Sequence, residues 1–299
     1  MKKLMRLTKS KKDNMVAYLC LSPAIVGLLF LTIIPIFGVL GLSFTNWSGL
    51  TSPDFVGLQN YKKIFTEDFF FTKSLIVTLY YAFGAVVSSI IYAFFVSIIL
   101  NQRIPARGVA RSIFFIPYII PVVATSVVWS WLYDCNFGVL NFVLNTLGFD
   151  KSLFLQGEKT VVPSLIFIAV WTCGNLIVIF LAGIQNVPRA YLEAVEIDGG
   201  NAWHKFRHVT IPMMTPIIFF NFLMCMITNL QVFVPAQALT RGGPNDSSLF
   251  IVYLIYREGF MKNNFGYASS ISLIFFIFIA ILTGLIFKAS NKVVFYEGK

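Results

Sequence analysis

The sequence predicts an all-α membrane protein with about six transmembrane helices. Two observations lead to this prediction. Hydrophobic residues make up 57% of the 299 residues and charged residues 12%, and the mean hydropathy is +0.78, so there are too few charges to cover a water-soluble surface. The apolar residues also fall in long charge-free runs. Each run is long enough to cross about 30 Å of hydrocarbon as a helix, which takes about 20 residues.

The runs follow one another along the whole chain, and none contains Asp, Glu, Lys, Arg or His. In order they are Met15–Leu42, Ser74–Leu100, Ser112–Tyr133, Val161–Leu181, Ile211–Val234 and Tyr267–Phe287. We therefore expect a basic cytoplasmic tail over residues 1–14, a six-span transmembrane domain over 15–287, and a second cytoplasmic tail over 288–299. With six spans, both termini lie in the cytoplasm.

The charge distribution supports this topology. The chain has a formal net charge of +10, and the basic excess falls on the N-terminus, on the second and fourth connections and on the C-terminus. Such asymmetry is the positive-inside pattern of membrane proteins. A polybasic start such as Lys2–Lys12 favours anionic lipid over nucleic acid as its partner. The first apolar run is too long for the core of a signal peptide, so we interpret it as a retained span.

The chain offers no means of powering transport by itself. It lacks the GxxxxGK[ST] loop that cradles ATP phosphates, and its spans lack the carboxylates and basic groups that couple transport to protons or sodium. If the protein moves a solute uphill, the energy must therefore enter from a partner. We expect this chain to bind no cofactor and no metal. A passive channel would not need a partner.

The inner connection over residues 182–212 has the sequence of a helix, a tight turn and a helix. Pro188 suits the first turn of a helix, where its missing N–H costs nothing. Ala190–Ile197 is rich in helix formers, and Gly199 and Gly200 end the helix where left-handed backbone geometry is needed. We expect Asn201 to cap a second short helix that runs through Phe206.

The two faces of the first of these helices differ. Leu192 and Val195 share one face and are expected to pack onto the spans, which leaves Glu193 and Glu196 for solvent or a partner. Pro212 marks the return of the chain toward the bilayer.

This segment resembles a motif of the permease subunits of binding-protein-dependent ABC importers. The motif is Glu-Ala-Ala, three residues, Gly, nine residues, and Ile-x-Leu-Pro. Here Glu193-Ala194-Val195, Gly199 and Val209-Thr210-Ile211-Pro212 have identical spacing. The departures are Val for the second Ala, Val for Ile and Ile for Leu, all apolar exchanges.

A second set of stretches is similar to carbohydrate-uptake permeases, and in particular to the larger permease subunit of maltose transport. The most distinctive are Leu239-Thr-Arg-Gly-Gly-Pro244, Tyr253-Leu-Ile-Tyr256 and Phe55-Val-Gly-Leu-Gln-Asn-Tyr61. The resemblance extends over essentially the whole chain.

The resemblance implies a type I ABC importer permease fold in the bacterial plasma membrane. It also implies a second homologous permease, two ATPase subunits below, and a sugar-loaded binding protein outside. The loop at Gly242, Gly243 and Pro244 would face the binding protein. The residues that would couple to the ATPase are Glu193, Ala194, Val195, Asp198, Gly199, Ile211 and Pro212, with Glu193 as an ion-pair partner and Gly199 as the turn.

Polar residues within the apolar runs are candidates for the substrate path. Sugars are bound by amide hydrogen bonds and by aromatic stacking on their C–H faces. The candidates are Trp171, Asn175, Thr228, Asn229, Gln231 and Phe233. The alternative is that these side chains merely hydrogen-bond one helix to another.

Three other functions are weighed against a sugar permease. The spacing of His204 and His208 fits a metal on a helix, but Lys205 follows His204 where metalloproteases have Glu. The transported solute could instead be glycerol phosphate or an amino acid. An intramembrane enzyme is disfavoured because no span holds a nucleophile and a base together, so we expect no catalytic residue.

Overall fold

The computed structural model describes residues 2–102 and 104–290, and the part of the predicted C-terminal tail beyond Ser290 lies outside them. The described chain is mostly helical and divides into two compact units. One unit holds residues up to Glu67 together with Arg257–Ile274, and the other holds Asp68–Tyr256 together with the chain from Phe275 onward. We describe each unit by itself.

The first unit begins with a long apolar helix. It is formed by α1 (Lys2–Leu28), a π-helical turn η1 (Leu29–Ile33) and α2 (Ile34–Leu42), which together give a candidate span at Asp13–Leu42. A small antiparallel hairpin of β1 (Thr45–Asn46) and β2 (Asp54–Phe55) follows, then the short helix α3 (Gln59–Thr66). The first predicted span is therefore present, with helix continuing back to Lys2.

The hairpin and α3 are tied to the start of the last span. Asn60 Nδ2 donates to the carbonyl oxygens of Ser43 (3.0 Å) and Thr45 (2.9 Å), and Ser270 Oγ donates to the Ser43 carbonyl at 2.8 Å. This unit also contains the π-helical turn η5 (Arg257–Met261) and the first part of α14 (Phe265–Ser290). The outer connection that follows the first span is thus a structured element.

The second unit is built around α4 (Phe69–Asn101), the longest helix of the chain. Asp68 caps it, since its Oδ1 accepts from the backbone N–H of Phe70 at 2.8 Å. Helices α8 (Val161–Trp171), α9 (Gly174–Gln185), α12 (Ile211–Leu230) and α13 (Ile251–Tyr256) all pack on α4. α5 (Arg107–Ile119) packs on α9.

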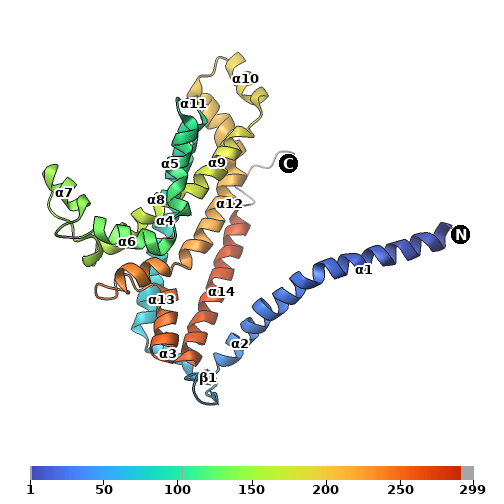
Figure 1. The fold of residues 1–299 in the computed structure, drawn as a ribbon, viewed down its shortest axis with the longest axis vertical. Helices are drawn as coiled ribbons and strands as arrows, with labels where there is room; N and C mark the ends of the chain where they lie inside the picture. The colour runs from blue at the N-terminus through green and yellow to red at the C-terminus, as the bar shows by residue number, and fades with distance from the viewer. Residues whose placement is uncertain (1, 103, 291–299) are drawn as a thin grey trace. The chain divides into compact units, whose positions relative to one another are not determined.

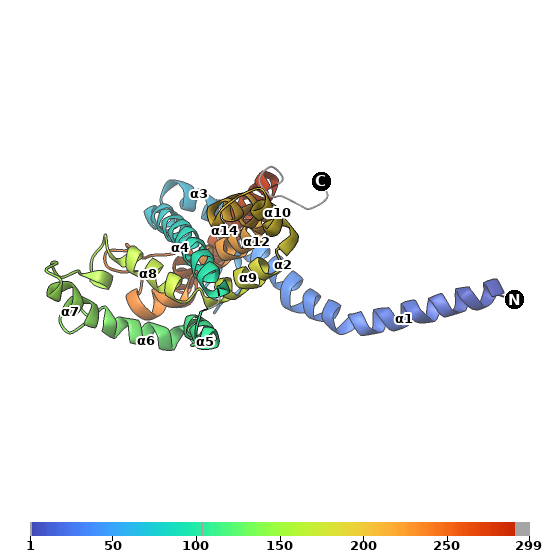
Figure 2. The same ribbon diagram turned by 90° about the horizontal axis from the view of Figure 1, so that it is seen from above.

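The third predicted span is not one straight helix, as the charge-free run suggested. α5 and α6 (Val122–Leu132) meet at an angle of 99°, and Figures 1 and 2 show α6 leaving the direction of α5. The break falls at Pro121, which has no backbone N–H to continue the helix. Ile120 before it is extended (φ −66°, ψ 130°), the conformation that a following proline favours.

The fourth predicted span is also bent. α8 and α9 meet at 47°, with the break at Thr172 and Cys173. The described residues therefore contain four straight candidate spans, or six if each bent pair counts as one. The short elements between them, α7 (Val139–Thr146), the 3₁₀ turn η2 (Phe154–Gln156) and the π-helical turn η4 (Ala236–Thr240), lie in the outer connections.

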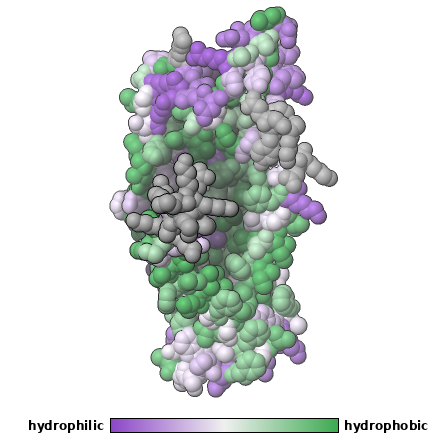
Figure 3. All heavy atoms as spheres, turned by 90° about the vertical axis from the view of Figure 1, so that its right-hand side faces the viewer, coloured by the Kyte–Doolittle hydropathy of each residue, from purple (hydrophilic) through white to green (hydrophobic). Residues whose placement is uncertain are grey.

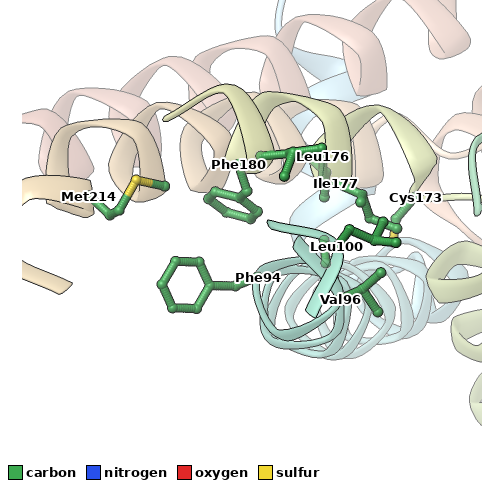
Figure 4. Close-up of a cluster of buried hydrophobic side chains, with 10 residues drawn as sticks. Phe94, Val96, Leu100, Cys173, Leu176, Ile177, Phe180 and Met214 are labelled. Atoms are coloured by element: carbon green, nitrogen blue, oxygen red, sulfur yellow. The ribbon is translucent and has the colours of Figure 1, made fainter. Parts of the chain in front are cut away.

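The best-packed core of this unit lies where α4, α9 and α12 meet (Figure 4). Phe180 and Met214 are fully buried there, and Phe94 meets Phe180 edge-to-face at 5.4 Å between ring centroids. Gly183 lets α9 and α12 come together, because a Cβ at that position would lie 2.4 Å from Ile217 Cδ1. This core packs α4 against α9, from which the inner connection leaves, and against α12, to which it returns.

Candidate functional site: the cytoplasmic helix-turn-helix

The inner connection forms the helix predicted from the sequence. Pro188 is extended (φ −62°, ψ 130°) and precedes α10 (Arg189–Ile197). In Figure 3 hydrophilic residues gather over the end of the unit that carries α10 and α11, and hydrophobic residues cover the helices below. The segment thus lies beyond the apolar part of the helices, as an inner-face segment should.

Two glycines end α10, each for a different reason. Gly199 has φ +77°, a left-handed conformation that residues with a Cβ rarely adopt. Its N–H bonds to Glu196 O at 3.0 Å, and Gly200 N–H bonds to Val195 O at 2.8 Å, which is the Schellman pattern. Gly200 is needed for space, because a Cβ there would lie 2.5 Å from Val195 Cγ1 and 2.8 Å from Val195 O.

The second helix begins where the sequence predicts but does not end at Phe206. Asn201 Oδ1 accepts from His204 N–H at 3.1 Å, and Asn201 N–H donates to His204 Nδ1 at 3.3 Å, forming a capping box. α11 (Ala202–Lys205) then continues through the π-helical turn η3 (Phe206–Thr210) into α12. The prediction of a separate short helix was wrong, because Pro212 sits in the first turn of α12, where helices tolerate proline.

The outward face of α10 is both acidic and apolar. Ala190, Glu193, Ala194 and Ile197 are all exposed and lie on one side of the helix, given 100° per residue. Ile197 is 87% exposed, although it is a large aliphatic residue outside the candidate spans. Exposed apolar groups grouped around one charge are typical of a docking surface for a protein.

The other face of α10 carries Leu192 and Val195, which are partly buried, and their packing onto the spans stays a prediction. Val195 therefore belongs to the packing of the turn against Gly200, and not to the exposed face that carries Glu193 and Ala194. Asp198 and Gly199 are exposed at the turn, and Ile211 and Pro212 are partly buried at the start of α12.

Glu196 differs from Glu193. It forms an ion pair with Lys205, which closes the turn between α10 and α11, with side-chain exposures of 60% for Glu196 and 25% for Lys205. Glu196 is therefore exposed, as expected, but its partner lies within the chain itself. A pair this exposed contributes little to stability, and it joins α10 to α11 across the turn.

An aromatic series connects the helix-turn-helix to the core. Trp203 lies 5.5 Å from Phe206 between ring centroids, and Phe206 lies 6.2 Å from Phe94. Phe94 in turn contacts Phe180 of α9. A displacement of α11 therefore reaches close-packed side chains of α4 and α9. Phe206 was not among the predicted site residues, although an apolar residue in an otherwise polar segment is a signal that could have pointed to it.

The substrate-path candidates lie in two groups. Trp171 ends α8 and is 37% exposed, and Asn175 lies one residue into α9, so both flank the bend of the fourth span. Trp171 meets Trp129 of α6 edge-to-face at 5.5 Å. Trp129 is buried, and its Nε1 has no hydrogen-bond partner among the described residues.

The second group lies at the outer end of α12. Thr228 Oγ1 donates to Met224 O at 2.9 Å, and Asn229 Nδ2 donates to Cys225 O at 2.8 Å. Gln231, just after the helix, is exposed. Both hydrogen bonds lie within α12 itself. The alternative interpretation, in which these side chains join one helix to another, requires bonds to a second helix.

Phe233 follows in the same group and belongs to an aromatic cluster. Its ring lies 5.2 Å from Tyr256 and 6.3 Å from Tyr253. Cys173, at the bend beside the first group, belongs to the core of α4, α9 and α12, and Cys225, whose carbonyl accepts from Asn229, packs against that core. Trp129, which was not among the predicted residues, joins the first group through its contact with Trp171.

The outer loop with Gly242, Gly243 and Pro244 is firmly held. Ser248 Oγ donates to Gly243 O at 2.6 Å, and Gly242 adopts φ +85°. Neighbouring Asn245 receives Lys73 Nζ on its carbonyl oxygen at 2.5 Å and donates from Nδ2 to Glu158 Oε1 at 3.0 Å. The loop is thus fixed to α4 and to the turn that precedes α8.

The two histidines take part in the helix-turn-helix. His204 Nδ1 is used in the capping box, and the rings of His204 and His208 stack at 6.0 Å. Within residues 2–102 and 104–290, no group of three or more His, Cys, Asp or Glu side chains could hold a metal ion.

Comparison with known proteins extends this description. Residues 93–295 match the family model described as "Binding-protein-dependent transport system inner membrane component". The chain is 36% identical over 293 residues to the probable ABC transporter permease protein YesP of Bacillus subtilis, covering 97% of this chain and 94% of the relative. It is 33% identical to the multiple sugar-binding transport system permease protein MsmF of Streptococcus mutans, covering 86% and 89%.

The fold is likewise that of a known transporter. A chain of a bacterial ABC transporter for import of the acidic polysaccharide alginate superimposes with a TM-score of 0.83, at 20% identity, over 96% of this chain and 99% of that one. The structure and the sequence thus agree on a multi-pass membrane permease whose inner connection forms α10 and α11. This chain belongs to the inner membrane components of binding-protein-dependent transport systems, the permeases of ABC importers.

Proposed function

We propose that this chain is one permease subunit of a bacterial ATP-driven sugar importer, and that α10 is its docking element for an ATPase subunit. The observation that carries the proposal is the outward face of α10, where Glu193 lies beside the 87% exposed Ile197. A basic residue of the ATPase would pair with Glu193, and an apolar cleft would cover Ile197. ATP and magnesium are bound by the ATPase subunits and not by this chain, which catalyses no covalent reaction.

The proposed partners follow from the family. A second homologous permease completes the translocation path, two ATPase subunits lie below, and an external binding protein delivers the sugar. The loop at Gly242, Gly243 and Pro244 is the proposed contact for the binding protein, because it is held in place by Lys73 and Glu158. A docking loop fixed in advance loses less conformational entropy on binding.

The proposed substrate is a sugar, and an oligosaccharide in particular. MsmF is named for sugar transport, and the structural relative imports a polysaccharide. The candidate path supplies what a sugar requires, with Trp171 and Phe233 as aromatic faces and Asn175, Asn229 and Gln231 as amides.

The experiment measures uptake of a panel of labelled sugars by vesicles that contain the complete transporter. Glu193→Ala should abolish uptake of the accepted sugar while the permease remains in the membrane. Glu67→Ala, which removes an exposed carboxylate of the first outer loop, serves as the matched control and should leave uptake unchanged. Normal uptake by Glu193→Ala would refute the docking role, and uptake of no sugar by the unmodified transporter would refute the substrate class.

A further inference from the structure

Arg107, the first residue of α5, binds the cytoplasmic end of α4. Its Nε donates to Leu100 O at 2.7 Å, and its Nη2 lies 3.4 Å from Asn101 Oδ1. Leu100 is in the last turn of α4, where carbonyl groups have no partner within the helix. A cation is favourable there because the negative end of the helix dipole points toward it. Arg107 therefore joins α5 to α4.

The same arginine and Arg111 also hold the end of α9. Gln185 is the last residue of α9. In the amide orientation that satisfies both donors, its side-chain oxygen accepts from Arg111 Nη2 at 3.0 Å and from Arg107 Nη2 at 3.1 Å. Bonds from a guanidinium are among the stronger hydrogen bonds in proteins. One neutral side chain thus receives two cationic donors.

The position of Gln185 gives these bonds their importance. The next three residues, Asn186 to Pro188, lead directly into α10. Any displacement of α10 therefore pulls on the last turn of α9. Helix ends are the least stable part of a helix, and this turn also contains Gly183, a weak helix former. Without a clamp, the pull could unwind the turn and never reach the spans.

We propose that Arg107, Arg111 and Gln185 form a latch that makes the end of α9 move together with α4 and α5 when α10 is displaced. The latch rests on the proposed docking role of α10, and it names positioning residues for the same coupling. α4 packs on α8, α9, α12 and α13, so a movement transmitted to it reaches most of the unit. Arg111 Nε is buried without a partner among the described residues.

The test measures sugar uptake and ATP hydrolysis in the same proteoliposomes, which contain the complete transporter and receive sugar-loaded binding protein. Gln185→Leu removes the acceptor but leaves α10 intact. ATP hydrolysis should persist, while the sugar transported per ATP falls about fivefold, the lower end of typical coupling between distant sites. Gln185→Glu keeps an acceptor and should transport as the unmodified protein does. Gln102→Leu, at the exposed end of α4, is the matched control.

The results separate the latch from the docking role. Glu193→Ala should lower ATP hydrolysis and uptake together, whereas Gln185→Leu should lower only the ratio of sugar to ATP. If Glu193→Ala has its expected effect but Gln185→Leu keeps a normal ratio, the latch is refuted and the docking role stands. If Glu193→Ala has no effect, the docking role itself is refuted.

Two further measurements keep the proposal testable if Gln185→Leu fails to assemble. Arg111→Ala should also lower the ratio of sugar to ATP, because it removes one of the two guanidinium groups that donate to Gln185. Hydrogen exchange of the amides at the end of α9 should be slower in Gln185→Glu, because two guanidinium groups then face a carboxylate. Exchange equal to that of the unmodified protein would overturn the proposal.

Discussion

The geometry of the turn that ends α10 predicts what it costs to replace either of its two adjacent glycines, Gly199 and Gly200, by alanine. Gly199 adopts φ +77° and has no atom within 4 Å of the position that a Cβ would occupy. Replacing it by Ala therefore costs backbone strain alone, about 1–2 kcal/mol. Alanine also reduces the conformational entropy of the unfolded chain, which offsets about 0.4–1 kcal/mol of that cost. The net cost is about 1 kcal/mol.

Asparagine provides the matched variant at this position. It visits the left-handed region more readily than alanine does, so Gly199→Asn should cost less than Gly199→Ala. At Gly200 the limit is the space for a Cβ and not the backbone conformation. Its replacement by Ala forces a contact 2.5 Å from Val195 Cγ1 and another 2.8 Å from Val195 O. Adding Val195→Ala removes the first contact but not the second, so it should restore the turn only in part.

The assay is hydrogen exchange of the backbone amides that close the turn, measured on the purified transporter. A loss of about 1 kcal/mol in local opening free energy makes these amides exchange about fivefold faster in Gly199→Ala. In Gly200→Ala the exchange of these amides should accelerate by more than fivefold. Exchange in Gly199→Ala equal to the unmodified protein, or faster exchange in Gly199→Asn than in Gly199→Ala, would refute the conformational reasoning.

Three other predictions concern single side chains. Asn221→Leu should raise the thermal unfolding midpoint. Both amide atoms of buried Asn221 lack a partner among the described residues, and an unpaired buried polar group costs about 1–3 kcal/mol. A lowered midpoint would show that a partner is present. Backbone N–H groups of Phe137 and Asn136 hold the pKa of Asp134 below its usual value. The stability that ionised Asp134 contributes is therefore present above that usual value and is lost as pH falls through the lowered pKa. An Asp134→Asn variant whose stability depends on pH as that of the unmodified protein does would contradict this. Lys205→Met should increase proteolysis at the turn after α10, because Glu196 loses its partner, and an unchanged cleavage rate would show that the glycine turn alone fixes the angle.

The sequence predicts the spans well because charge-free runs report burial in lipid directly. All six predicted runs appear as helices, and the residue preferences of the inner connection correctly place α10, its end at Gly199 and the cap at Asn201. Hydropathy alone does not report the direction of a helix, however. It missed the 99° bend, although Pro121 marks the place where the missing N–H ends the helix.

The site is predicted less completely, because side-chain pairing depends on tertiary geometry. The sequence places Glu193 and Glu196 alike in a polar segment, whereas in the structure Glu196 binds Lys205. The exposure of Ile197 and the bonds from Arg107 to Gln185 arise only when the helices are assembled.

The most direct test of the central claim is site-specific photo-cross-linking from α10 in the complete transporter. A photoreactive residue at position 193 or 197, on the exposed face, should cross-link to the ATPase subunit. The same residue at position 192 or 195, on the partly buried face, should not. Cross-links from 192 and 195 in place of 193 and 197, or none to the ATPase from any of the four positions, would contradict the account.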